Sequence, residues 1–279
     1  MLLFAALLWG TAFVFQSVGM NVIGPLTLSA TRMTLGGLSL LPVIAAFGAK
    51  FNRLSVKAGI ACGLILCVAS NLQQFGLVST SAGKAGFITT LYVVIVPVMS
   101  IFLKKKVPGR IWICVAIAVT GFYFLCIKEN FTIEKGDFLV LMCSFCFSAH
   151  IMAVDHFNGK GADSLIISCV QFLTVGAIST VLMFVFEEPE WASVLQAKWS
   201  ILYLGIISSG LAYTLQIIGQ KRTNPTVGTL SMSMESVFAA VAGWLILNEH
   251  MSGKELLGCA LVFSAVVLAQ LPSKKRNLP

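Results

Sequence analysis

Long apolar runs, separated by short segments that contain charges, Pro, Gly or Asn, occupy most of the chain. A helix needs about 20 apolar residues to cross a bilayer, and its backbone groups must find hydrogen-bond partners within the segment. We therefore predict an all-α polytopic membrane protein with ten transmembrane helices. The predicted helices are Leu2–Met20, Pro25–Phe47, Val56–Val78, Ala82–Leu103, Arg110–Ile127, Gly136–Phe157, Ser164–Phe186, Trp199–Gly219, Pro225–Leu247 and Gly253–Leu271.

The composition supports this reading. Of the 279 residues, 57% are hydrophobic and 11% are charged, whereas soluble domains carry about 25% charged residues. Ten helices of about 20 residues each leave too little chain for a sizeable soluble domain. All 8 cysteines lie inside apolar runs, which excludes a secreted disulfide scaffold.

The basic residues are distributed unevenly between the predicted loops, and this asymmetry predicts the orientation. With the N-terminus in the cytoplasm, thirteen of the 19 Lys and Arg residues lie on the cytoplasmic side, five lie on the outer side, and Arg32 lies within a helix. Eight of the 11 acidic residues then lie on the outer side. The net charge of +8 thus reflects membrane topology and not nucleic-acid binding, and we expect both termini in the cytoplasm.

The two halves of the chain are weakly similar and in register. At a constant offset of 143 residues, seven positions of residues 69–106 are identical to their counterparts in 212–249, including Gln73 and Gln216. Five helices per half give the halves opposite orientations, an arrangement that recurs in transporters. We predict two inverted five-helix repeats, residues 1–128 and 136–271, and a basic cytoplasmic tail, residues 272–279.

Several short motifs follow one another along the chain. They are Leu8-Trp9-Gly10-Thr11-Ala12, Ala30-Thr31-Arg32, Thr80-Ser81-Ala82-Gly83-Lys84-Ala85-Gly86-Phe87, Ser208-Ser209-Gly210-Leu211-Ala212-Tyr213, and the stretch from Glu235 to Glu249 followed by Gly258 and Leu261. Over nearly its whole length the chain resembles the drug/metabolite transporter superfamily, in its EamA-type ten-helix branch. The resemblance implies a permease of the plasma (inner) membrane, typically an exporter of small metabolites, amino acids or drugs, with a central cavity lined by both halves. Many relatives read Glu-Pro-Val where this chain has Glu235-Ser236-Val237, so the resemblance does not carry a proline kink over to the ninth helix.

Glu235 lies ten residues into the ninth predicted helix, near the membrane midplane. A charged acid at that depth costs on the order of 3 kcal/mol on insertion scales, so we expect the side chain to face the protein interior. It is a candidate for proton coupling or cation binding, and the alternative is a structural acid that holds helices together. Tyr92 is its counterpart at the 143-residue offset, and the pair is consistent with a shared central site.

Two further ionisable residues lie within predicted helices. Arg32 is in the second helix, where its family match favours a structural role and substrate contact is the alternative. His150 is near the middle of the sixth helix and is a candidate proton relay or a packing residue. His150 and His156 lack further ligands at metal spacing, so no metal site is predicted.

Amide and aromatic side chains are additional candidates for the cavity, with helix packing or the ordinary core as the alternative. They are Asn71, Gln73 and Gln74 on the third predicted helix, Gln216 and Tyr213 on the eighth, and Trp9 on the first. Pro97 frees the Val93 carbonyl and predicts a kink close to Tyr92. Gly59 and Gly63 have the Gly-x-x-x-Gly spacing that permits close helix packing.

The sequence therefore predicts a transporter, not an enzyme: an alternating-access exporter of a small organic solute, coupled to protons through Glu235. The alternative within transport is uncoupled facilitation around a structural Glu235. An intramembrane enzyme with a carboxylate dyad is excluded because Glu235 is the single acid deep in a predicted helix, and the scarcity of loops argues against a non-transporting scaffold. The expected partners are the solute, the lipid bilayer and, in the coupled case, protons, with no cofactor and no nucleic acid.

Overall fold

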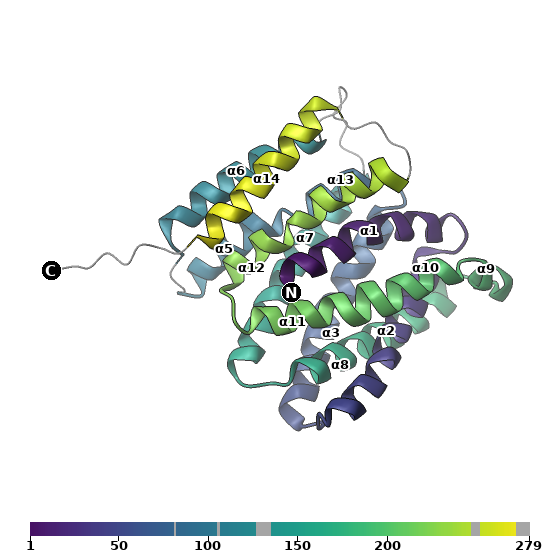
Figure 1. The fold of residues 1–279 in the computed structure, drawn as a ribbon. Helices are drawn as coiled ribbons and strands as arrows, with labels where there is room; N and C mark the ends of the chain where they lie inside the picture. The colour runs from purple at the N-terminus through teal and green to yellow at the C-terminus, as the bar shows by residue number, and fades with distance from the viewer. Residues whose placement is uncertain (81, 105–106, 127–134, 247–251, 272–279) are drawn as a thin grey trace.

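The computed structural model describes residues 1–80, 82–104, 107–126, 135–246 and 252–271, and every element in these ranges is a helix. Figure 1 labels them: α1 Leu2–Met20, α2 Pro25–Phe47, α3 Arg53–Gly76, α4 Ala82–Thr89, α5 Tyr92–Phe102, α6 Gly109–Cys126, α7 Lys135–Gly159, α8 Ser164–Phe186, α9 Trp191–Gln196, α10 Lys198–Leu202, η1 Tyr203–Tyr213, α11 Thr214–Gln220, α12 Pro225–Met232, α13 Met234–Ile246 and α14 Gly253–Gln270. The predicted tail, residues 272–279, lies outside the described residues, as do Asn248 and Glu249 of the last motif.

The helices have the lengths and composition of a multi-pass membrane protein. Within the described ranges, seven helices are long and apolar enough to cross a membrane, and two further apolar helices, Gly109–Phe124 and Leu256–Ala269, are shorter. The all-α part of the prediction is thereby confirmed for these ranges, and the seven long apolar helices are consistent with a multi-pass membrane protein.

Local sequence signals set several helix ends. Pro25 and Pro225 begin α2 and α12, where the missing amide proton costs nothing and the fixed φ angle suits a helix. The side chains of Asn52, Asp163 and Asn224 accept hydrogen bonds from amides in the first turns of α3, α8 and α12. These local signals explain why the predicted starts at Pro25, Ser164 and Pro225 agree with the structure.

Two of the predicted helices are interrupted near their middles. The fourth is divided into α4 and α5 at Thr90 and Leu91, and the ninth is divided into α12 and α13 at Ser233. The hydroxyls of Thr90 and Ser233 donate to the carbonyls three residues earlier, at 2.7 and 2.8 Å, and such local bonds compete with the helical pattern. The second interruption thus forms without a proline, while α5 continues through Pro97.

The eighth predicted helix is also irregular. It consists of α10, η1 and α11, and η1 is a π-helix of 11 residues. The structure adds one short helix that the sequence pattern did not predict, α9, before this segment. Turns of the π type within helices are frequently found at functional sites.

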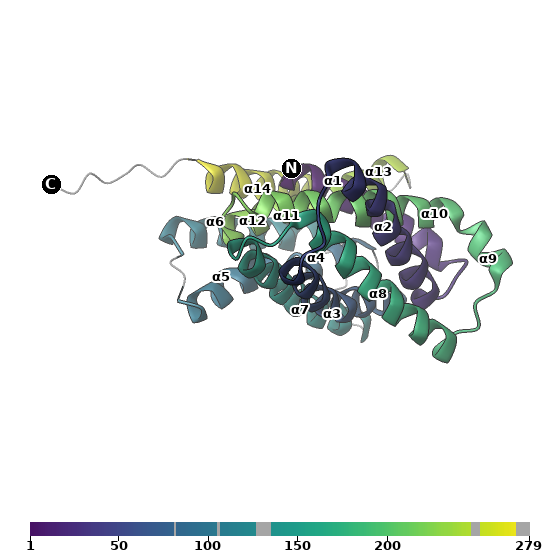
Figure 2. The same ribbon diagram turned by 90° about the horizontal axis from the view of Figure 1, so that it is seen from below.

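The helices form two peripheral groups with a central group between them. Figures 1 and 2 show α6 and α14 side by side at one end, and α2, α3 and α8 together at the other. Between them lie α1, α7, α12 and α13, with α1 packed on α13 and α3 packed on α7. Gly59 and Gly63 of α3 face Val170 and Thr174 of α8, so the predicted close packing at this glycine pair is confirmed.

A carboxylate fixes the start of α2 against the end of α8. Glu187, the residue after α8, accepts hydrogen bonds from the amides of Leu26 and Thr27, both at 2.8 Å, and from the Thr27 hydroxyl at 2.7 Å. The first turn of a helix leaves amides without partners within the helix, and negative charge is favourable there. Glu187 therefore holds the helix that carries Arg32 in place.

Candidate functional site

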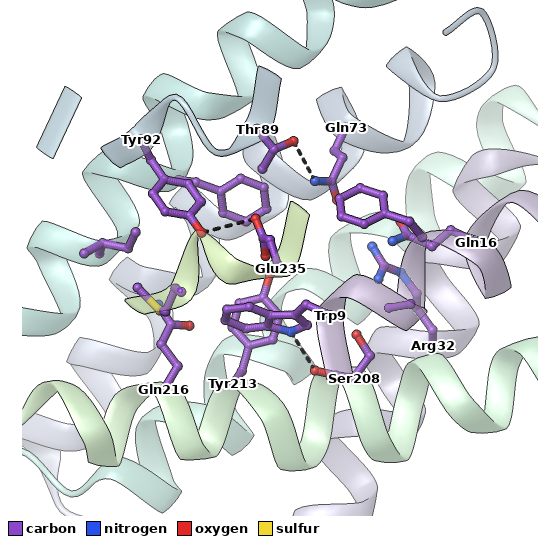
Figure 3. Close-up of a pocket in the computed structure, with 15 residues that line it drawn as sticks. Trp9, Gln16, Arg32, Gln73, Thr89, Tyr92, Ser208, Tyr213, Gln216 and Glu235 are labelled. Carbon is purple, nitrogen blue, oxygen red and sulfur yellow. Dashed lines mark hydrogen bonds between the residues drawn. The ribbon is translucent and has the colours of Figure 1, made fainter. Parts of the chain in front are cut away.

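A cavity lies in the central group of helices, and Figure 3 shows the side chains that line it. The space that its atoms leave free is about 540 Å³, including space continuous with the solvent. Seven of the predicted candidates line it: Trp9, Arg32, Gln73, Tyr92, Tyr213, Gln216 and Glu235. The structure thus brings together side chains from α1, α2, α3, α5, η1, α11 and α13.

Glu235 is at the centre of the labelled group in Figure 3. It is the second residue of α13, directly after the interruption at Ser233, and is 5% exposed. Tyr92, the first residue of α5, donates a hydrogen bond from its hydroxyl to Glu235 Oε1 at 3.2 Å. A second hydrogen bond joins the two interrupted helices: the hydroxyl of Ser236 donates to the hydroxyl of Thr90 at 3.1 Å. The interruptions of the two helices therefore lie next to each other, beside the cavity.

Trp9 and Tyr213 form one wall of the cavity. The indole N–H of Trp9 donates to the Ser208 carbonyl of η1 at 3.1 Å, and the Trp9 and Tyr213 rings meet edge to face with centroids 4.7 Å apart. Because Trp9 is fixed at both its polar and its apolar atoms, its ring has little freedom to turn. Both rings are among the residues that line the cavity.

Arg32 reaches the cavity from α2 and is 4% exposed. Its Nε is buried without a hydrogen-bond partner, and no ion pair joins the guanidinium to any acid of the described residues. In Figure 3 the guanidinium points toward the amide of Gln16, whose oxygen is also buried without a partner. A buried cation left in this state carries a desolvation cost that an incoming anion would relieve.

Three predicted candidates lie behind the cavity wall. His150 places Nε2 3.0 Å from Gln171 Oε1 and meets the Tyr213 ring at 6.1 Å between centroids. Asn71 donates to the Cys67 carbonyl at 2.9 Å and to the Ser179 hydroxyl at 3.2 Å, so it contributes to packing between α3 and α8. Gln74 is fully buried, and neither of its amide atoms has a partner. None of the three is among the lining residues.

Other lining residues were missed by sequence reasoning. They are Ala12, Phe13, Gln16, Thr89, Phe147, Ile151, Ser208 and Met232. A signal existed for two of them, because Phe13 and Gln16 follow Trp9 at the i+4 and i+7 positions of one helix face. The backbone carbonyl of Ser208 accepts the Trp9 indole hydrogen bond, a role that no side-chain pattern reveals. Across the described residues, no group of three or more His, Cys, Asp or Glu side chains is placed to hold a metal ion.

Comparison with known proteins identifies the family. The sequence profile of the EamA-like transporter family matches residues 1–127 and 134–271. The chain belongs to the EamA-like transporter family. Similar proteins include an uncharacterized transporter of Archaeoglobus fulgidus, 26% identical over 95% of this chain and 83% of that protein. YoaV, an uncharacterized transporter of Bacillus subtilis, is 22% identical over 98% and 96% of the two chains.

Two further similarities bear on the function and the fold of this EamA-like transporter. The threonine/homoserine exporter RhtA of Salmonella typhimurium is 25% identical over 88% of this chain and 82% of that protein. A crystal structure of another protein superposes with a TM-score of 0.75, at 21% identity, over 95% of this chain and 96% of that chain. The second similarity establishes a shared fold, and the sequence relatives agree with a role in transport.

Proposed function

We propose that the protein is an alternating-access exporter of a small organic solute, built from two inverted five-helix repeats. The observation that carries the proposal is the hydrogen bond between Tyr92 and Glu235. It joins two interrupted helices at residues 143 positions apart, which is the offset of the sequence repeat. Interrupted helices that meet at a central cavity are typical of transporter binding sites.

The packing of α2 and α8 supports the inverted repeat. A Cβ atom at Gly37 of α2 would meet Leu173 of α8, and a Cβ atom at Gly176 of α8 would meet Thr34 of α2. Leu173 lies three residues before Gly176, and Thr34 lies three residues before Gly37. The two contacts are therefore reciprocal, as a two-fold relation between the helices requires.

The other helix contacts are consistent with the same relation. The last helices of the two proposed repeats, α6 and α14, pack on each other, and the contacts of α1 with α12 and α13 have their counterpart in the contacts of α7 with α4 and α5. The two ranges that match the family profile follow the proposed repeats, residues 1–128 and 136–271. In the proposed mechanism, rocking of one group of helices against the other opens the cavity alternately to each side of the membrane.

Export as the direction, and protons as the coupling ion, rest on different observations. Export is supported by the similarity to the threonine/homoserine exporter RhtA, and cytoplasmic termini in an inner membrane are supported by the basic residues of the loops. Coupling is assigned to Glu235, which accepts a hydrogen bond from Tyr92 and lines the cavity together with Tyr213. Uncoupled facilitation is the second candidate, because the bond from Tyr92 also suits a purely structural Glu235.

Transport assays on the reconstituted protein distinguish proton-coupled export from uncoupled facilitation. Proteoliposomes that contain a pH-sensitive dye are exposed to a panel of small metabolites, amino acids and drugs. Coupled transport predicts a solute-driven pH change that Glu235→Gln abolishes and that Glu188→Gln, a matched change at an exposed acid, preserves. Solute flux without a pH change, unaltered in Glu235→Gln, would establish facilitation. An absence of flux for every solute, with insertion verified, would contradict transport.

A further inference from the structure

The first two helices of each half bury almost the same positions. At an offset of 139 residues, ten of the eleven buried residues of α2 fall on buried residues of α8, a helix of the same length. At an offset of 138, eight of the nine buried residues of α1 fall on buried residues of α7. These offsets differ slightly from the 143 residues of the later helices, as insertions between helices would produce. Each residue of α1 and α2 therefore has an identifiable counterpart in the second half.

Most of the cavity is lined by such counterparts. With these offsets, ten of the fifteen lining residues form five pairs with one member from each half. The pairs are Trp9 and Phe147, Phe13 and Ile151, Gln73 and Gln216, Thr89 and Met232, and Tyr92 and Glu235. The centre of the cavity thus follows the repeat.

One end of the cavity departs from this symmetry. Ala12, Gln16 and Arg32 of the first half line it, and Figure 3 shows Gln16 and Arg32 together on one side of the labelled group. Their counterparts in the second half do not line it and are fully buried; they are His150, Val154 and Gln171. Arg32 and Gln171 are each the eighth residue of their helix, so in inverted halves they lie toward opposite sides of the membrane. The cavity thus extends along α1 and α2 and is closed along α7 and α8.

The closed end contains polar atoms without partners. His150 Nε2 lies 3.0 Å from Gln171 Oε1, and because an amide oxygen only accepts, Nε2 carries the proton and Nδ1 of the neutral ring is an acceptor. This Nδ1 and the donor Nε2 of Gln171 are buried without hydrogen-bond partners. Such atoms are rare in native proteins. Contact with the contents of the cavity in another state of the protein would provide both with partners.

We propose that His150, Val154 and Gln171 line the cavity in the state that opens toward the opposite side of the membrane. There they take the places that their counterparts in the first half take here. Two inverted halves that exchange their conformations convert an opening on one side into an equivalent opening on the other. The inference rests on the proposed alternating-access function and names residues of its second state. In that state the solute meets an imidazole acceptor and an amide donor where it meets a guanidinium here.

Cysteines at counterpart positions report the side of the membrane that each position reaches. Gln16→Cys and Val154→Cys form a matched pair, and His150→Cys adds the position with the unpartnered nitrogen. Sealed membrane vesicles of either orientation are treated with a membrane-impermeant maleimide, and the labelled residue is identified by mass spectrometry, so the native cysteines stay in place. We expect Gln16→Cys to be labelled from one side, and Val154→Cys and His150→Cys from the other. The predicted orientation makes these the outer and the cytoplasmic side.

Ser144→Cys is the control for burial. Ser144 lies on α7, as His150 does, and both Ser144 and its counterpart Ala6 are fully buried and do not line the cavity. Neither state should expose it. Because a minor state holds about 0.1–10% of the molecules, we expect Val154→Cys and His150→Cys to be labelled on the order of tenfold faster than Ser144→Cys, or more.

The outcomes separate this inference from the transport function. If Val154→Cys or His150→Cys transports a solute but is labelled no faster than Ser144→Cys, the inference fails and the proposed function stands. Labelling of both variants from the same side as Gln16→Cys would also overturn it. Val154→Cys removes no hydrogen-bonding group, so it remains a test if His150→Cys does not fold. If no solute is transported by inserted wild-type protein, the proposed function itself fails.

Discussion

Substitution of Gly10 by Ala tests the contact between α1 and α13. A Cβ atom at this position would lie 2.6 Å from Phe238 Cβ, 2.7 Å from the Glu235 carbonyl oxygen and 2.8 Å from the Ala239 amide nitrogen. Two of these three atoms belong to the backbone of α13 and cannot move aside alone. The methyl group therefore forces the two helices apart at the residue that carries the central carboxylate.

The expected magnitude follows from comparison with a second glycine. Overpacking of this kind costs about 1–3 kcal/mol, while replacing Gly by Ala within a helix gains about 1 kcal/mol of helix propensity. A Cβ atom at Gly86 of α4 would lie 3.6 Å from the Phe13 ring, an ordinary van der Waals contact. Gly86→Ala thus gains the propensity without the clash. The difference in stability between Gly10→Ala and Gly86→Ala isolates the overpacking, about 1–3 kcal/mol.

The two variants are compared by thermal unfolding in one detergent at one heating rate, together with transport in proteoliposomes. We expect Gly10→Ala to melt at a lower temperature than Gly86→Ala and to transport more slowly, because Glu235 moves away from Tyr92. A Gly10→Ala protein that is as stable and as active as Gly86→Ala would refute the packing described for α1 and α13.

Three other substitutions test single contacts. Glu187→Ala should lower stability by about 1–2 kcal/mol, as the loss of a helix cap does, with Glu187→Gln intermediate in thermal unfolding. Trp9→Phe should cost about 1–2 kcal/mol because the Ser208 carbonyl loses its donor, whereas Trp191→Phe at an exposed site should leave the melting temperature unchanged. Tyr92→Phe should slow transport on the order of tenfold with little change in melting temperature; equal losses in both would indicate a structural role alone.

The positions of the helices were predictable because their signals are local. Apolar length, the prolines at the starts of α2 and α12, and the Asp163 cap of α8 act within one turn of the residues they affect. The identities of Glu235, Arg32 and Trp9 as cavity residues were also accessible, since a polar or aromatic side chain stands out in an apolar run. Predicting these features does not require knowing which helices are in contact.

The irregular segments were not predictable from local signals alone, because contacts between distant residues accompany the local hydroxyl bonds of Thr90 and Ser233. Ser236 donates to the Gly86 carbonyl or the Thr90 hydroxyl, residues 150 and 146 positions away. The Ser208 carbonyl of η1 accepts from Trp9, 199 positions away. Sequence reasoning placed Asn71, Gln74 and His150 correctly within helices, but the side each faces depends on how α3, α7 and α8 pack.

The bond between Tyr92 and Glu235 indicates where a two-fold axis would pass. In an inverted repeat, two equivalent residues can touch only near the axis that relates them, and this pair is separated by the repeat offset. The cavity they line would therefore lie on the axis, where motion of one half relative to the other changes access most directly. Their chemistry differs, a phenol in one half and an acid in the other, and Arg32 adds a base from the first half only. Because side chains of both halves line the cavity, its shape would depend on their relative position.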